Sequence, residues 1–232
     1  MRKLPLVLCA LSIVVLGTAA GQAGPDEAVQ RNNLGASLLQ QGKVEEAIAE
    51  FRKAVELDPK YTTAHLHLGY AYDRKGRIED AMATYRTVIE LEPGSVIAHT
   101  NLGVLYDRKG LYDEAIGEFE HALRIDPANA TARTNLENAK RSKGIVHERE
   151  ERFAQAKREV EADPKNSRAA YNLGRLYASY DKKDQALQWL AKALKLGFDD
   201  FKFMKDDPAL AGLRNDPDFT RLVEEAVAGS PR

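Results

Sequence analysis

The sequence contains very little cysteine, and this scarcity excludes several kinds of protein. Cys9 is the only cysteine among 232 residues, and it lies inside a short apolar run near the start of the chain. A lipoprotein anchor would need its cysteine at the end of such a run, after a small residue, and Cys9 comes too early. If the run is removed, the remaining chain can form no disulfide, so its fold cannot depend on one in an oxidising compartment.

An excess of one charge and the common catalytic motifs are also missing. The chain has 34 Lys and Arg against 35 Asp and Glu, a formal net charge of −1, which argues against a general binder of nucleic acids or anionic membranes. It contains no phosphate-binding glycine loop, no G-x-S-x-G and no H-E-x-x-H motif. We therefore expect no enzymatic activity and no cofactor.

The five histidines are spread along the chain and do not suggest a metal site. His65 and His67 are two residues apart, so on a helix they point to nearly opposite faces. His65 and His99 belong to successive copies of a repeat, and packed helices about 8–10 Å apart would keep their rings too distant for one zinc ion. We expect packing roles for His65 and His99 and no bound metal.

The first 24 residues differ in kind from the rest. Arg2 and Lys3 precede an apolar run over residues 4–16, which small residues follow up to Ala20 and Ala23. This order predicts a secretory signal peptide over residues 1–23, cleaved after Ala20 or Ala23. The run is shorter than the about 20 residues that a membrane-spanning helix needs, although an uncleaved anchor is the alternative. We expect a periplasmic or secreted protein of a bacterial envelope.

One pattern recurs three times at a constant spacing. Residues 33–59, 67–93 and 101–127 carry the same residue types at the same offsets, 34 residues apart. The aligned sets are Leu34, Leu68 and Leu102; Gly35, Gly69 and Gly103; Gly42, Gly76 and Gly110; Ala47, Ala81 and Ala115; Phe51, Tyr85 and Phe119; and Pro59, Pro93 and Pro127. A period of this length is typical of stacked helical repeats.

The pattern closely resembles the tetratricopeptide repeat (TPR), which has a Leu-Gly pair in its first helix, an Ala and an aromatic residue in its second, and a terminating Pro. The resemblance implies an all-α fold, a right-handed superhelical α-solenoid of about five helix pairs with a C-terminal helical cap. The predicted segments are TPR 1 (26–59), TPR 2 (60–93), TPR 3 (94–127), a degenerate TPR 4 with a long charged second helix (128–164), TPR 5 (165–197) and the cap (198–228).

The shared residues have physical reasons. Gly103 lacks a side chain, so the second helix can approach closely, and its cost of about 1 kcal/mol in a helix interior suggests that packing requires it. Ala115, Phe119 and Ala122 form one stripe of the second helix. Gly110 stands where a helix C-cap needs a left-handed residue. A single pair cannot bury its apolar stripe, so stacked neighbours must do so.

The fourth repeat departs from the pattern. Glu137 stands where Gly is expected, Gly144 keeps the spacing, and Pro164 comes three residues later than the period requires. The charged stretch over residues 145–161 predicts a second helix that buries only Phe153, Ala156 and Val160. The alternative for this stretch is a solvated spacer helix.

The pattern returns at Asn172-Leu173-Gly174 and stops after Gly197. In the tail, Asp207 and Asp216 each precede a proline, and Asp as N-cap before Pro is a helix-start signal. We predict short helices over residues 207–213 and 216–228. Their apolar side chains would cover the open end of the fifth repeat.

The surface best suited to binding is a second stripe on the first helices, distinct from the core stripe. One column of this stripe reads Asn33, His67, Asn101 and Asn135, with Asn172 added if the fifth repeat stays in line. Amides can hydrogen-bond the backbone of an extended peptide, and the resemblance to TPR proteins implies this use here. The predicted partner-binding residues are Asn33, His67, Tyr70, Arg74, Asn101, Arg108, Asn135 and Asn138.

Other side chains on this stripe suggest what a bound segment would carry. Tyr70 could pack on an apolar side chain, and Arg74 and Arg108 could each pair with a carboxylate through two hydrogen bonds. Asp73 and Asp107 precede these arginines, and the alternative is that they neutralise them. The clamp of Lys and Asn by which some TPR proteins hold a terminal carboxylate lacks its Lys on this face of the first repeat.

Together these features predict a non-catalytic scaffold of the bacterial envelope that binds an extended segment of another protein in the concave groove. One alternative is a scaffold that oligomerises through its convex or terminal surfaces. Another is a non-catalytic subunit of an envelope enzyme complex. We expect no nucleic-acid partner and no membrane contact beyond the signal sequence, and the sequence leaves the oligomeric state open.

Overall fold

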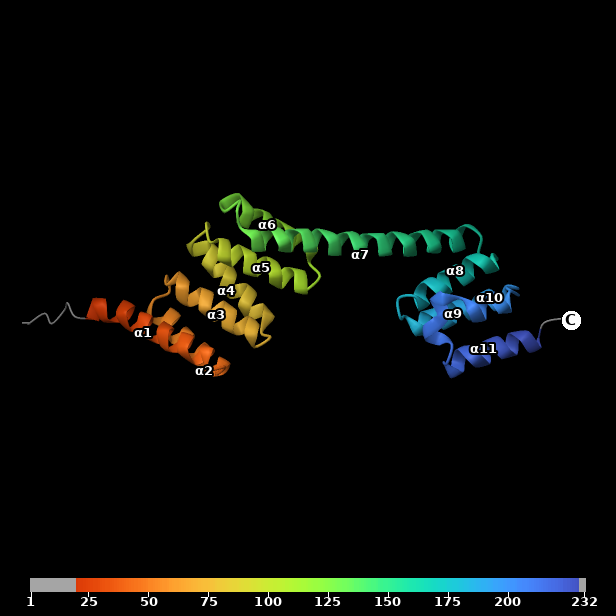
Figure 1. Cartoon of the computed structure of the whole chain (residues 1–232), viewed down its shortest axis with the longest axis horizontal. Coiled ribbons are helices and arrows are strands. Elements are labelled where there is room, and N and C mark those ends of the chain that lie inside the picture. The colour runs from red at the N-terminus through yellow and green to blue at the C-terminus, as the bar shows by residue number, and fades with distance from the viewer. Residues whose placement is uncertain (1–19, 230–232) are drawn as a thin grey trace, which may run out of the picture. The chain divides into compact units, whose positions relative to one another are not determined.

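A computed structural model describes residues 20–229, and these residues form helices and turns without a β-strand (Figure 1). The predicted signal peptide over residues 1–23 lies almost entirely outside the described residues. No helix within residues 20–229 is both long enough and apolar enough to span a membrane. The chain divides into two compact units, residues 1–142 and 143–232.

The first unit consists of three helix pairs followed by the first part of a long helix. Its elements are α1 (Ala20–Gln40) with α2 (Val44–Leu57), α3 (Thr62–Arg74) with α4 (Ile78–Leu91), α5 (Val96–Arg108) with α6 (Tyr112–Ile125), and α7 (Ala130–Ala162). Each pair also packs on the next, α2 against α3 and α4 against α5. The predicted all-α stack of helix pairs is confirmed.

Glycine in the first helix of a pair lets an aromatic ring of the second helix pack against its backbone. A Cβ added at Gly103 would lie 2.6 Å from Cε1 of Phe119, and one at Gly69 would lie 2.8 Å from Cε1 of Tyr85. Both rings are only 1% exposed. A side chain at either glycine would push the two helices apart, which confirms the predicted reason for the shared glycines.

A repeated polar contact joins the first helices to the turns that precede them. His65 Nε2 lies 3.0 Å from the carbonyl oxygen of Pro59, and His99 Nε2 lies 3.1 Å from that of Pro93. Arg133, at the same position in α7, donates to the corresponding proline carbonyl at 2.6 Å. The packing role of His65 and His99 therefore includes a hydrogen bond. No group of three or more potential metal ligands occurs within residues 20–229.

The second unit adds a helix pair and a three-helix tail to the rest of α7. Its elements are α8 (Ser167–Ala178), α9 (Lys183–Lys195), α10 (Phe201–Asp206), the 3-10 helix η1 (Pro208–Leu213) and α11 (Pro217–Ala228). Asp207 caps η1 by accepting from the Ala209 N–H at 2.9 Å, and Asp216 caps α11 by accepting from the Asp218 N–H at 3.0 Å. These two helix starts are the predicted ones, whereas the sequence did not indicate α10.

The predicted break inside the fourth repeat is wrong, because α7 continues through Gly144 as one helix. Glu137 provides one physical reason, since a side chain at this position prevents the close approach that Gly103 allows to Phe119. Gly144 also lacks the left-handed conformation of its counterpart Gly110, whose φ is +75°. With no place for a second helix to pack back, continuing the helix keeps its backbone hydrogen bonds.

The second part of α7 packs on α8. Val160 is 7% exposed and belongs to a cluster with Leu173, against which Ala156 also packs. The ring centroid of Phe153 lies 4.9 Å from that of Tyr177. Val160 is buried and Phe153 and Ala156 are partly buried, so the alternative of a wholly solvated spacer is wrong for this part of the helix.

Replacing the glycine at this repeat position with alanine should lower stability after α5 and raise it within α7. Gly110→Ala should destabilise the first unit by about 1–2 kcal/mol, because Gly110 has a positive φ. Gly144→Ala should stabilise α7 by about 1 kcal/mol, because no atom beyond its own helix turn lies within 4 Å of an added Cβ. Native-state hydrogen exchange at the amides of α5 and α7 would measure both effects. A loss of protection around Gly144 in the second variant would contradict a continuous α7.

The tail covers the apolar end of the α8–α9 pair, as predicted for a cap. Its most buried side chains are at most 4% exposed and form one cluster with Ala186, Leu190 and Ala193 of α9; they are Met204, Leu210, Phe219 and Val223. The tail thereby gives the second unit an apolar core of its own.

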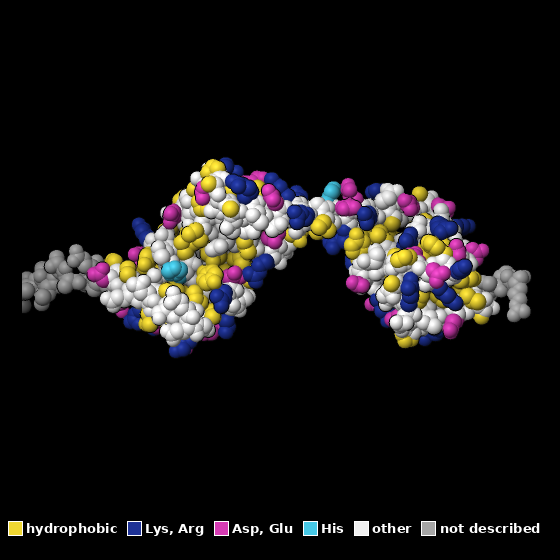
Figure 2. Space-filling view, viewed as in Figure 1, with side chains coloured by type: hydrophobic (Ala, Val, Ile, Leu, Met, Phe, Trp, Pro, Cys, Tyr) yellow, Lys and Arg dark blue, Asp and Glu magenta, His cyan; other side chains and the backbone are white. Residues whose placement is uncertain are grey.

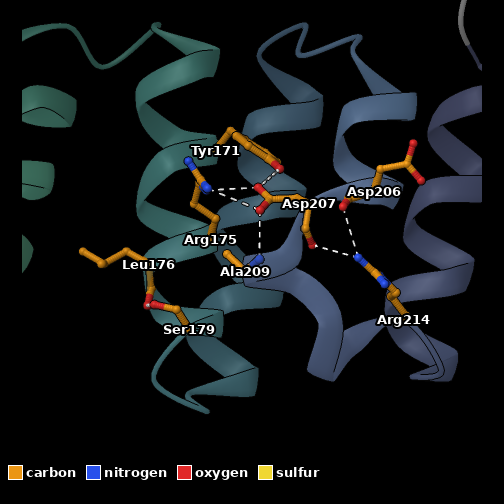
Figure 3. A network of polar contacts seen from close by, with 8 residues as sticks. All are labelled: Tyr171, Arg175, Leu176, Ser179, Asp206, Asp207, Ala209 and Arg214. Carbon is orange, nitrogen blue, oxygen red and sulfur yellow. Dashed lines mark hydrogen bonds and ion pairs between the residues drawn. The ribbon is translucent and has the colours of Figure 1, made fainter.

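A buried carboxylate, Asp207, ties the tail to α8 (Figure 3). Asp207 is 1% exposed, and its Oδ2 accepts from the Tyr171 hydroxyl at 2.6 Å and lies 3.0 Å from Arg175 Nε. Its Oδ1 accepts from the Ala209 N–H and from Arg175 Nη2. Burial and the nearby Asp207 carboxylate raise the pKa of Tyr171, so its hydroxyl keeps the proton that it donates.

Candidate partner-binding groove

The predicted stripe remains accessible along the four first helices of the first unit. Its exposed members are Val29, Asn33, Gln40, Thr63, Tyr70, Arg74, Ile97, Arg108, Thr131 and Asn138. Its partly buried members are Ala36, His67, Asn101, Val104 and Asn135. On the visible face of each unit, acidic and basic side chains are interspersed, with no extended area of one charge (Figure 2).

Two members of the predicted amide column hold the helices together. His67 Nδ1 lies 2.8 Å from Oδ1 of Asn32, which is 3% exposed, and Asn32 in turn donates to the Tyr61 hydroxyl at 3.4 Å. The His67 ring also packs at 5.4 Å, centroid to centroid, on Phe51 of the preceding pair. Burial lowers the pKa of His67, so the neutral ring is favoured.

Asn101 occupies the same position on α5 and contacts Tyr85 of the preceding pair. Burial raises the pKa of Tyr85, and the side-chain hydrogen bond with Asn101 partly offsets this effect. By contrast, Asn33, Asn135 and Asn138 make no side-chain hydrogen bond to another residue within 20–229. These three amides are the ones that retain their full capacity to bind a peptide backbone.

The same stripe also carries apolar side chains. Ile97 is 60% exposed and Tyr70 is 42% exposed, so both present apolar surface to water on this stripe. Val104, the counterpart of Tyr70 on α5, is partly buried. An apolar side chain of a bound segment could remove Ile97 and Tyr70 from water.

The arginines of the stripe have different partners. Arg108 pairs with Asp73 of the preceding first helix, so the alternative that this carboxylate neutralises it is correct. Arg74 donates to the Tyr70 hydroxyl at 3.2 Å and forms no ion pair with a residue in the described part of the chain. Asp107, by contrast, leaves its Oδ1 buried without a hydrogen-bond partner.

The second unit contains a hollow of its own. It has a volume of about 770 Å³ and lies between the second part of α7 and α8, where Asn172, Arg175 and Leu176 line one wall and Arg158 and Glu159 line the other. Asn172 therefore belongs to this hollow and is described with the second unit. Arg175 is already paired with the buried Asp207.

The predicted set missed three residues whose side chains meet or flank this stripe, namely Asn32, Tyr85 and Asp107. Asn32 lies one position off the stripe and reaches His67 across the helix interface. Tyr85 lies on the second helix of its pair, in the core stripe. Periodicity identifies faces of single helices, so it could not show which side chains meet between neighbouring pairs.

Acidification should weaken the first unit through His67. The folded state lowers the pKa of His67 and the unfolded chain has the ordinary value of about 6.5, so below this value the unfolded state binds more protons. Stability should therefore fall as the pH decreases from about 7 to about 5.5. The control is His67→Asn, which copies Asn101. Urea unfolding followed by circular dichroism should show a smaller pH dependence in this variant, and an equal dependence would contradict the assignment.

Two sequence models of one family match the chain. The model described as TPR repeat matches residues 35–76, and the model described as tetratricopeptide repeat matches residues 66–130 and 141–200, more than half of the chain. The chain belongs to the tetratricopeptide repeat family. In this TPR protein the second matched range begins inside α7, so TPR-like sequence also extends through the second unit.

Solved TPR structures share the fold. The first TPR of Spaghetti (RPAP3), bound to an HSP90 peptide, has a TM-score of 0.51 and 22% identity, covering 52% of this chain and 95% of that one. The first TPR domain of human RPAP3 has a TM-score of 0.51 and 22% identity, covering 53% and 98%. The Arabidopsis OM64 TPR domain has a TM-score of 0.50 and 18% identity, covering 51% and 98%. Comparison with curated protein sequences found no match.

Proposed function

We propose that this TPR protein is a non-catalytic interaction module that binds an extended segment of another protein. The site is the groove formed by α1, α3, α5 and the first part of α7. The observation that carries the proposal is the exposure of Ile97 and Tyr70 on the stripe that also carries amides without a side-chain partner within the described residues. The peptide bound to the first TPR of Spaghetti (RPAP3) supports it, because that domain has the same fold.

The spacing of the first helices suits an extended chain. Packed helices lie about 8–10 Å apart, and an extended chain advances about 3.3 Å per residue, so one bound residue in three would meet the same row of side chains. Ile97 and Tyr70 would bury apolar side chains of the segment. Asn135 and Asn138 would hydrogen-bond its backbone, which holds the segment without reading every side chain.

Selection from a random peptide library displayed on phage tests the proposal with the full chain as bait. We expect enrichment of peptides that bind wild-type protein. Ile97→Asp should weaken the affinity for these peptides by roughly 10- to 100-fold, because burial of one Ile side chain contributes about that much to binding. Ile145→Asp is the matched control, because Ile145 lies outside the stripe and is 61% exposed, against 60% for Ile97. Equal loss of affinity in both variants would contradict binding in the groove.

We further propose that the protein is exported to the bacterial envelope. The basic start, the apolar run over residues 4–16 and the small residues before Gly24 support a cleaved signal peptide. Expression in a Gram-negative host, followed by fractionation and N-terminal sequencing, should give periplasmic protein that starts at Gly21 or Gly24. Cytoplasmic protein that retains residues 1–23 would contradict export.

A further inference from the structure

Asp107 lacks the ion pair that its counterpart in the preceding repeat forms. Its Oδ1 is buried and has no hydrogen-bond partner within residues 20–229, although buried carboxylate oxygens are nearly always satisfied. Its counterpart Asp73, one repeat earlier on α3, pairs with Arg108 of the next first helix. The same carboxylate position is therefore satisfied in one repeat and orphaned in the next.

The missing partner can be identified from the repeat spacing. Arg108 follows Asp73 by 35 residues, and the residue that follows Asp107 by the same interval is Ser142. A serine side chain is shorter than arginine and carries no charge, so it cannot reproduce the ion pair. Asp107 forms no ion pair with another residue within 20–229.

A second group on α5 shows the same deficiency. Thr100 is 8% exposed, and its Oγ1 has no hydrogen-bond partner in the described part of the chain. Asn32, at the same repeat position on α1, bonds to His67 of the next first helix. Each orphaned group has a counterpart in one earlier repeat that bonds to the following first helix, Asp73 on α3 for Asp107 and Asn32 on α1 for Thr100, and neither bond has an equivalent between α5 and α7 within the described residues.

We propose that a lysine or arginine side chain of the bound segment pairs with Asp107 and replaces the arginine that α7 does not provide. This inference rests on the proposed groove function. Asp107 as a residue is partly exposed, so a bound side chain would meet its carboxylate from the solvent side. Arg108 cannot serve instead, because it is engaged by Asp73.

This pairing makes the groove selective for a basic residue at one place in the segment. A lysine or arginine gains a charge-assisted hydrogen bond to a carboxylate that otherwise has a buried, unsatisfied oxygen. An acidic residue at the same place meets a like charge and is rejected. The partner class is therefore an extended segment with a basic side chain at a fixed distance from the apolar side chains that cover Tyr70 and Ile97.

Selection from the same phage library, with full-length variants as bait, tests the pairing. Wild-type protein should enrich Lys or Arg at one fixed position, and Asp107→Asn should remove that preference. One peptide enriched by wild-type protein would be synthesised for affinity measurements. Asp107→Asn should weaken its binding by roughly 10- to 100-fold, because a hydrogen bond to a charged group contributes about that much to affinity. Glu114→Gln, an exposed change on α6, is the charge-matched control and should leave the affinity unchanged.

Ser142→Arg provides a second, independent variant. It supplies an arginine at the repeat position that pairs with Asp107, so it should also remove the preference for Lys and Arg in the selected peptides. Enriched peptides without a basic preference, or a preference that persists in either Asp107→Asn or Ser142→Arg, would overturn the pairing and leave the groove function intact. If wild-type protein enriches no peptide, the groove function and the pairing both fail.

Discussion

Asp207→Ala should lower the free energy of unfolding of the second unit by about 2–4 kcal/mol. The substitution leaves the buried Tyr171 hydroxyl without its acceptor, which costs about 1–3 kcal/mol. It also removes the N-cap of η1, which costs about 1 kcal/mol. Arg175 is 40% exposed at its side chain and can return to water, so its lost ion pair adds little.

Trp189 allows this effect to be measured in the second unit alone. It is the only tryptophan and lies on α9, packed against the cluster that the tail covers. Its fluorescence during urea unfolding should show the lower stability of Asp207→Ala. Asp216→Ala is the matched control, since it removes an equivalent cap from α11 without a buried hydroxyl and should cost only about 1 kcal/mol. Equal losses in the two variants would show that the buried contacts of Asp207 contribute nothing.

Phe119→Ala should lower the free energy of unfolding of the first unit by about 3–5 kcal/mol, the usual cost of removing a buried aromatic ring. The ring is 1% exposed and packs in a cluster with Ala115 and Ala139, whose small side chains cannot fill the cavity. Circular dichroism during urea unfolding measures the change. Tyr70→Ala, which removes an aromatic ring that is 42% exposed, is the control and should change stability by no more than about 0.5 kcal/mol.

Gly103→Ala adds a sharper test of the same contact. In wild-type protein the new Cβ meets the Phe119 ring at 2.6 Å, and overpacking of this kind costs about 1–3 kcal/mol. In the Phe119→Ala background the ring is gone, so Gly103→Ala should cost much less. A double-mutant cycle measures this difference, and additive effects would contradict the close approach as the reason for the glycine.

The helix pairs were predictable because their signals are local and periodic. Gly110 ends a helix by adopting a conformation that other residues avoid, and its neighbours in the pattern are small or aromatic at fixed offsets. The caps at Asp207 and Asp216 were predictable for a similar reason, since a short side chain bonds to backbone groups two or three residues away. Such contacts depend on sequence spacing more than on the tertiary fold.

The continuous α7 was not predictable from the spacing of Gly144. Glycine permits a left-handed helix end and does not require one. The deciding condition is tertiary, because a helix turns back only where a second helix can pack closely on it. Glu137 removes that possibility, and its significance becomes clear only when the contact between Gly103 and Phe119 is known.

The side chains that share a stripe on the first helices were predictable, and the contacts between them were not. The 34-residue period identified which side chains share a stripe, including Tyr70 and Asn138. It did not show that His67 is bonded to Asn32, because this contact depends on how far two side chains reach across a helix interface. The orphaned oxygen of Asp107 is visible only in comparison with the ion pair that Asp73 forms.

Chemical-shift mapping is the most direct measurement of where this TPR protein holds its partner. The amide and methyl signals of the full chain would be recorded before and after addition of a synthetic peptide taken from the wild-type phage pool. We expect the largest changes at Tyr70, Ile97 and Asn138, on α3, α5 and the first part of α7. Changes confined to α2, α4 and α6, or to the tail, would contradict binding in the groove of the first helices.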